Sequence, residues 1–193
     1  MVGGVDPMDD LIRIAYRLEQ FCRRHQWRFC FIGGVALQHW GRPRLTQDVD
    51  LCLLTGFGNE EAFIDPLLAQ YAARVEGPRE FALANRVLLL ATPDGVGLDV
   101  SLGGIPFEER LVDRACDVEY LPGMSLRICS AEDLVILKAF ADRLQDWADI
   151  DGVVRRRGDS LDWDYIDREL QTLCELKEAP EIPPKLHDIR RKR

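Results

Sequence analysis

One short segment of this sequence limits most strongly what the chain can fold into. Asp48 and Asp50 flank Val49, and the apolar run LCLL follows them. We predict a strand over Asp48–Leu54, so that both carboxylates leave the same face. Two like charges on a half-buried strand repel each other, and Mg²⁺, which prefers carboxylate oxygens, relieves the repulsion. The pair therefore predicts a metal site, and the alternative is a solvated strand edge.

A Gly-Gly turn precedes the aspartate pair. Trp27–Ile32 is predicted as a buried strand that Gly33 and Gly34 end, and Val35–Trp40 is predicted as a short helix. Bare backbone N–H groups before a helix N-terminus offer a place for a triphosphate. Each motif is weak by itself, but the order of turn, short helix and paired aspartates is fairly specific.

The other predicted elements indicate an α/β (α+β) fold, with a small mixed sheet and helices gathered toward the C-terminal side. Apolar residues three and four positions apart predict a helix over Asp9–His25. Further helices are expected over 60–73, 131–144, 147–156 and 164–176. Strands are expected in the second half of 81–91, over 97–102 and near 118–120, the first two as a hairpin across Pro93-Asp94-Gly95.

The length of 193 residues fits a single domain. Its core is expected over about 9–125, with a helical part over about 130–178 and a loose basic tail over 180–193. The formal charge of −8 makes the protein a poor general binder of nucleic acid. Two basic runs stand out, RRRG at 155–158 and IRRKR at 189–193. They are solvated faces or tails, or they contact an RNA backbone or an acidic partner.

The cysteines and the N-terminus indicate a cytoplasmic location without membrane contact. No two of the six cysteines are spaced as C-x-x-C, so we expect reduced and mostly buried thiols. The start MVGGVDPMDD lacks the apolar core of a signal peptide. No apolar run approaches the roughly 20 residues that a membrane span needs.

The segment GGVALQHWGRPRLTQDVDL resembles the first motif of the nucleotidyltransferase superfamily, in which a GG or GS turn, a short helix and paired aspartates recur. Its form is similar to the AbiEii-like toxin nucleotidyltransferases of toxin–antitoxin and phage-defence systems, and also to small antibiotic nucleotidyltransferases. GLDVSLGG places Asp99 on a strand, where the family has its third carboxylate. Lys138, Arg143, Asp146 and Asp149 match a later segment of AbiEii-like members.

This resemblance, which covers about residues 29–151, implies transfer of a nucleoside monophosphate from a nucleoside triphosphate to an acceptor hydroxyl. Asp48, Asp50 and Asp99 would hold two Mg²⁺ ions, and Asp99 would also activate the acceptor. Lys138 would neutralise charge on the departing pyrophosphate. Together these four are the expected catalytic residues.

The resemblance also implies a set of nucleotide contacts. The residues expected to contact the nucleotide or its phosphates are Gly33, Gly34, Arg42, Arg44, Thr46 and Lys138. Some positions have simpler interpretations. Lys138 could snorkel from an apolar helix face, and the later Arg and Asp residues could be surface ion pairs. His39 and Trp40 are expected to pack under the short helix.

For an AbiEii-like toxin, the resemblance implies an RNA acceptor, such as the end of a tRNA, or a protein side chain. It also implies an antitoxin protein as a partner. Adenylylation of a small molecule is the alternative among enzymes. A non-catalytic module that binds a nucleotide, or joins an antitoxin, is the alternative from another class.

Overall fold

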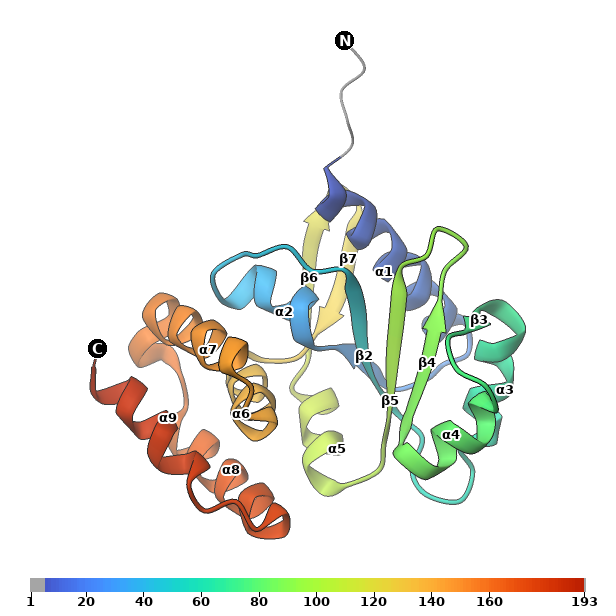
Figure 1. Ribbon diagram of the computed structural model, residues 1–193. Coiled ribbons are helices and arrows are strands. Elements are labelled where there is room, and N and C mark those ends of the chain that lie inside the picture. Colours follow the sequence, from blue (N-terminus) through green and yellow to red (C-terminus); the bar gives the residue numbers. More distant parts are fainter. Residues whose placement is uncertain (1–5, 193) are drawn as a thin grey trace. The chain divides into compact units, whose positions relative to one another are not determined.

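The computed structural model describes residues 6–192, and these residues divide into two compact units (Figure 1). Unit 1 holds residues 6–35 together with Leu45–Cys129. Unit 2 holds Ala36–Arg44 together with residues 130–192. The sheet lies in unit 1, and unit 2 is helical.

Unit 1 is built on a mixed sheet, which has seven strands within the described residues, in the order β3-β4-β5-β2-β1-β7-β6. The strands are β1 (Phe29–Phe31), β2 (Asp48–Leu54), β3 (Ala72–Ala73), β4 (Val87–Ala91), β5 (Gly97–Gly103), β6 (Cys116–Leu121) and β7 (Met124–Ile128). Strand β2 at the centre runs parallel to β5 and antiparallel to β1. The predicted hairpin is present as the antiparallel pair β4–β5.

The alternation of side chains along β2 sets the two faces of the sheet. Val49, Leu51 and Leu53 are fully buried on one face, while Asp48 and Asp50 leave the other. Each of these buried side chains contributes about 1.5–3 kcal/mol relative to its exposed state. The apolar face therefore fixes which way the aspartates point, because a register slip of one residue would bury them.

The helices of unit 1 are α1 (Pro7–Arg24), α3 (Glu61–Gln70), α4 (Pro78–Asn85) and α5 (Pro106–Asp113), and α2 (Gly33–Trp40) begins there. Helix α1 starts at Asp6, whose side chain accepts a hydrogen bond from the Met8 N–H. Its apolar stripe is buried and packs against β7, β2 and β6. In Figure 1, α1 lies behind the sheet.

Unit 2 contains α6 (Ala131–Ala141), α7 (Leu144–Arg157), α8 (Trp163–Lys177) and α9 (Ile182–Arg191), with a 3-10 turn at Gly158–Ser160. Ser130 caps α6 by accepting a hydrogen bond from the Asp133 N–H. Helix α6 ends at Asp142, which adopts a left-handed conformation with φ 55°. The chain therefore turns sharply into α7.

The predicted α/β fold is confirmed, but several elements differ from the sequence prediction. The helix expected over 60–73 ends at Gln70, because Tyr71 is extended and residues 72–73 pair with β4. Helix α4 and strand β7 were not predicted. The loose tail expected over 180–193 is wrong, since α9 fills most of it and buries Ile182 and Leu186.

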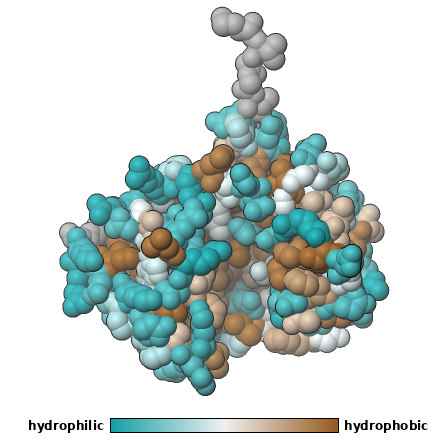
Figure 2. Space-filling model, viewed as in Figure 1, coloured by the Kyte–Doolittle hydropathy of each residue, from teal (hydrophilic) through white to brown (hydrophobic). Residues whose placement is uncertain are grey.

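The surface and the cysteines fit a globular protein. Hydrophilic side chains cover much of the face shown in Figure 2, and hydrophobic ones gather in small groups. All six cysteines are free, and five of them are buried. Within residues 6–192, no helix is both long and apolar enough to cross a membrane.

Candidate active site

The parallel pairing of β2 with β5 brings three carboxylates to one face of the sheet. Asp50 is the register partner of Asp99, and Asp48 is the partner of Gly97. Register partners on neighbouring strands share a face, and so do residues two apart on one strand. Asp48, Asp50 and Asp99 therefore leave the same face, near the N-terminal ends of both strands.

Two glycines make room for the aspartate pair. A Cβ atom on Gly33 would lie 2.0 Å from Asp50 Oδ2, and one on Gly97 would lie 2.2 Å from Asp48 Oδ1. Each carboxylate therefore occupies the space of an absent side chain. Gly33 also has φ +55°, a conformation that disfavours other residues. The Gly-Gly turn thus positions a carboxylate, in addition to its expected role toward phosphates.

The second glycine of the turn supports the same cluster. The Gly34 N–H donates to Asp50 Oδ2 at 3.5 Å, which is a long hydrogen bond. A Cβ on Gly34 would lie 2.4 Å from Thr46 Oγ1. Thr46 in turn donates to the Asp48 carbonyl at 3.4 Å. The structure therefore brings Gly33, Gly34 and Thr46 together with the aspartate pair.

Arg74, which the sequence did not single out, forms an ion pair with Asp99. Its guanidinium also lies 3.3 Å from the Cβ position of Gly97, the same position that Asp48 faces. Burial raises the pKa of Asp99, Arg74 opposes that shift, and the negative charge of Asp48 adds to it. Arg74 directly follows β3. No pattern in the sequence predicted this two-residue strand or the contact that Arg74 makes.

The donor chemistry of this cluster suits a hard divalent cation. Asp48, Asp50 and Asp99 offer carboxylate oxygens, and the effect of Asp48 on the Asp99 pKa indicates that their charges lie close enough to repel. Within the described part of the chain, no three His, Cys, Asp or Glu side chains are arranged to hold a metal ion as they stand. Asp99 is held by Arg74 instead.

Unit 2 carries a second cluster, which is built on Lys138. The Lys138 ammonium donates to Asp146 Oδ1 at 3.0 Å and to Asp149 Oδ2 at 2.7 Å. Lys138 is only 5% exposed, so it does not snorkel to solvent. Arg44 Nε donates to Asp149 Oδ1 at 3.1 Å, and Arg143 Nε donates to Asp146 Oδ2 at 2.6 Å.

These ion pairs have a clear local cause. The left-handed residue that ends α6 lets the chain reverse, so a lysine of α6 meets two carboxylates one turn apart on α7. Burial raises the pKa of Asp146, but hydrogen bonds from Arg143 and Lys138 hold it below the usual value. Of the expected site residues, Arg44 and Lys138 thus lie together in unit 2, which also contains Arg42. The expected site residues in unit 1 are Gly33, Gly34, Thr46, Asp48, Asp50 and Asp99.

A comparison with protein families decides the assignment. The family described as "Nucleotidyl transferase AbiEii toxin, Type IV TA system" matches residues 20–190. The chain belongs to this family. The nucleotidyltransferase assignment predicted from the sequence is therefore confirmed, and the protein is a nucleotidyltransferase. Among curated proteins, none matches the sequence.

Solved structures are similar to this AbiEii-family chain in fold. An antigenic nucleotidyltransferase-like protein from Paracoccidioides brasiliensis has a TM-score of 0.52 and 15% identity, over 93% of both chains. ANT(2")-Ia in complex with adenylyl-2"-tobramycin has a TM-score of 0.49 and 15% identity, over 95% of this chain and 98% of its own. The lincosamide antibiotic adenylyltransferase LnuA with lincomycin bound has a TM-score of 0.48 and 13% identity, over 72% and 92%. At such low identity, the first likeness shows a nucleotidyltransferase fold.

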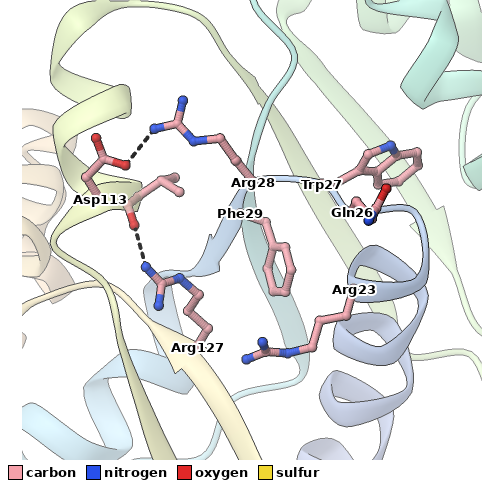
Figure 3. A pocket seen from close by; sticks show the side chains of 8 residues that line it. Arg23, Gln26, Trp27, Arg28, Phe29, Asp113 and Arg127 are labelled. Atoms are coloured by element: carbon pink, nitrogen blue, oxygen red, sulfur yellow. Dashed lines mark hydrogen bonds and ion pairs between the residues drawn. The ribbon is translucent and has the colours of Figure 1, made fainter.

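A cavity of about 380 Å³ in unit 1 is distinct from the carboxylate cluster (Figure 3). It is lined by Phe29, the register partner of Leu53, so it lies at the end of β2 opposite Asp48. Arg28 in this cavity donates to Asp113 at 2.6 Å, and Arg127 donates to the Val112 carbonyl at 3.1 Å. These arginines bind the C-terminal end of α5, where cations are favoured.

Proposed function

We propose that the protein transfers a nucleoside monophosphate from a nucleoside triphosphate to an acceptor hydroxyl, in a reaction that depends on Mg²⁺. The observation that carries this proposal is the carboxylate cluster in unit 1. Asp48, Asp50 and Asp99 share one face of two parallel strands, and glycines hold two of the carboxylates in place. Carboxylates gathered in this way suit a hard divalent cation.

Asp48, Asp50 and Asp99 are the residues that would hold magnesium. When bound, magnesium supplies positive charge at the phosphates and favours loss of the proton from the attacking hydroxyl. Asp99 is the residue to which we assign the acceptor side, because Asp48 and Asp50 already share one strand beside the turn. Arg74 would have to release Asp99 for this carboxylate to hold a cation.

The backbone of Gly33 and Gly34 and the hydroxyl of Thr46 are assigned to the triphosphate. The turn opens α2, and the N-terminus of a helix attracts anions. Neither glycine carries a side chain that would keep a phosphate at a distance. These contacts hold the substrate, so their loss is expected to weaken binding of the triphosphate.

Lys138 and Arg44 are assigned to the departing pyrophosphate. Their cluster pairs three cationic side chains, including that of Arg143, with the carboxylates of Asp146 and Asp149. Lys138 also holds the two carboxylates that orient the arginines, because it donates to both of them.

The acceptor that we propose is RNA, such as the end of a tRNA, and the biological role is that of a toxin with an antitoxin partner. Membership of a family of type IV toxins supports the toxin role. The RNA acceptor is the one that the resemblance in the sequence implies. Transfer to a protein side chain or to a small molecule is the competing outcome that an experiment must separate from transfer to RNA.

The test uses the full-length protein and nucleoside triphosphates labelled at the α-phosphate, with magnesium or with excess chelator. Total RNA, total protein and a mixture of hydroxylated antibiotics are offered in separate reactions. Label that enters RNA only with magnesium supports the proposal. Label that enters only a small molecule overturns the RNA acceptor. Magnesium-dependent binding of the triphosphate without any transfer overturns the enzymatic proposal for this chain.

Variants then separate the roles of the carboxylates. Asp50→Asn is expected to weaken magnesium-dependent triphosphate binding, whereas Asp99→Asn is expected to retain much of that binding and to lose transfer. Asp94→Asn is the matched control, because Asp94 is an exposed carboxylate on the turn between β4 and β5. Transfer by Asp99→Asn at the wild-type rate would remove Asp99 from the mechanism.

A further inference from the structure

The two basic runs that stand out in the sequence differ in the structure. In the terminal run, Arg190 forms an ion pair with Asp167 at 3.7 Å, and Arg191 pairs with Asp188. These charges are therefore balanced within unit 2. The run at 155–157 ends α7, where positive charge complements the helix dipole. The helix dipole explains why this end of α7 carries positive charge, but it does not explain which groups the arginine side chains contact.

Among the described residues, a carboxylate balances only the first arginine of this run. Arg155 Nε donates to Asp151 Oδ2 at 2.7 Å, one turn earlier on the helix. Arg156 instead donates to the Gly41 carbonyl at 2.9 Å. The guanidinium of Arg157 lies over the Trp40 ring, 4.8 Å from its centroid. Two exposed arginines of α7 therefore extend toward the segment that follows α2.

A third arginine joins them at this place. The Arg42 backbone is packed against α7, because a Cβ atom on Gly152 would lie 3.2 Å from Arg42 N. Across residues 6–192, no ion pair with a carboxylate involves Arg42, Arg156 or Arg157. We call these three side chains and the Trp40 ring the arginine patch. All of it belongs to unit 2.

The concentration of charge at the arginine patch contrasts with the rest of this acidic protein. In the cavity of Figure 3, for example, Arg23 contacts Asp117 at 2.8 Å and Arg28 contacts Asp113. At the arginine patch, the positive charges affect the neighbouring side chain of His39. Burial lowers the pKa of His39, and the charges of Arg156 and Arg157 lower it further.

We propose that the arginine patch binds the phosphodiester backbone of RNA. Guanidinium groups match phosphate oxygens in charge and in planar geometry, and they form paired hydrogen bonds with them. Trp40 holds one of these groups by a cation–π contact, which reduces the entropy lost on binding. This proposal rests on the proposed function and deepens it, because it names the surface of the chain to which the RNA acceptor binds.

The surroundings of the patch favour RNA over an acidic protein. Protein interfaces have an apolar core within a polar rim. The large apolar side chains that are exposed in unit 2 are those of Leu144 and Leu176, and neither belongs to the arginine patch. The patch instead combines guanidinium groups with one half-buried aromatic ring, a combination typical of nucleic-acid surfaces.

The experiment measures binding of a fluorescent single-stranded RNA of 20 nucleotides by anisotropy, across a series of salt concentrations and with chelator present. The triphosphate is left out, so the result does not depend on transfer. Arg42→Glu tests the patch, because within residues 6–192 the Arg42 side chain makes no hydrogen bond, ion pair or ring contact that the substitution would remove. Arg155→Glu is the matched control, since it makes the same charge change at the balanced end of the same surface.

Wild-type protein is expected to bind with an affinity that falls as salt increases. Arg42→Glu should lower the affinity for RNA at low salt at least tenfold. A variant with glutamine in place of Arg42, Arg156 and Arg157 should reduce the slope of log affinity against log salt by about 2, because each lost phosphate contact lowers the slope by about 0.7. Arg155→Glu should have a much smaller effect.

Equal loss in Arg42→Glu and Arg155→Glu overturns the proposal, because it would show general charge repulsion. Absence of salt-dependent RNA binding in the wild type also overturns it. Binding of polyglutamate in place of RNA would assign the patch to an acidic protein. In each case the labelling and metal-binding results for the carboxylate cluster stand separately.

Discussion

Replacing Gly33 by alanine tests whether the Gly-Gly turn positions the carboxylate cluster. The added Cβ would lie 2.0 Å from Asp50 Oδ2, whereas ordinary van der Waals contact begins at 3.4 Å. Either the turn or the carboxylate must therefore move by roughly 1 Å, and a misplacement of that size costs about a hundredfold in rate at an active site. We expect Gly33→Ala to bind Mn²⁺, a spectroscopic substitute for Mg²⁺, at least tenfold more weakly.

A matched control separates the clash from backbone strain. Gly33 has φ +55° and Gly123 has φ +74°, so alanine at either position is strained by roughly 1 kcal/mol. A Cβ on Gly123 meets nothing within 4 Å. Both variants should lose stability in urea unfolding, Gly33→Ala more than Gly123→Ala because of its added clash, but only Gly33→Ala should lose Mn²⁺ affinity.

The measurement is electron paramagnetic resonance of free Mn²⁺ during titration, which needs neither an acceptor nor turnover. Gly97→Ala should behave like Gly33→Ala, because its Cβ would lie 2.2 Å from Asp48 Oδ1. Mn²⁺ affinities that agree between Gly33→Ala, Gly123→Ala and the wild type would refute the claim that this glycine makes room for a metal ligand.

Three further predictions concern the buried polar groups of unit 2. Lys138→Met should reduce the free energy of unfolding, measured by urea denaturation, by about 3–5 kcal/mol. The reason is that Asp146 and Asp149 both lose the hydrogen bond that the Lys138 ammonium donates to them. Burial raises the pKa of Asp146, but hydrogen bonds from Arg143 and Lys138 hold this pKa below its value in the unfolded chain. The ionised carboxylate therefore stabilises the folded protein at neutral pH, and this stabilisation is lost as the pH falls through the folded-state pKa. Asp146→Asn should therefore flatten the acid side of a stability profile below about pH 4, and an unchanged slope would contradict this sign. Tyr165→Phe removes the 2.7 Å hydrogen bond to the fully buried Asp133 and should cost about 1–3 kcal/mol, as measured by thermal unfolding against Ser160→Ala on the surface.

Local patterns in the sequence predicted the catalytic strand and its surroundings because they depend on neighbours along the chain. The apolar alternation of β2 fixes which face carries Asp48 and Asp50, and the Gly-Gly turn fixes where β1 ends. The sharp turn after Ala91 has its own signal in Pro93-Asp94-Gly95, so the hairpin could also be predicted. A period of two residues gives the face of a strand without knowledge of its partner.

Other features were missed because local signals conflict or are short. Residues 72–73 look like the end of a helix, and they become β3 only because β4 offers a partner for their backbone groups. The tail after Pro180 is rich in charge and proline, and it forms α9 only because Ile182 and Leu186 find an apolar surface within unit 2. Tertiary burial outweighs weak helix propensity in such segments.

The sequence by itself determined the family, the α/β fold class and the carboxylates that are candidates for the metal site. The tertiary structure alone decided what each of these groups contacts. The register of β2 against β5 places Asp48 over Gly97 and Asp50 beside Asp99. Arg74, which follows β3, reaches Asp99 across β4, because β3 lies two positions from β5 in the sheet. The physical reason is that side-chain contacts between distant segments depend on strand order and register, which are set by the packing of the whole core.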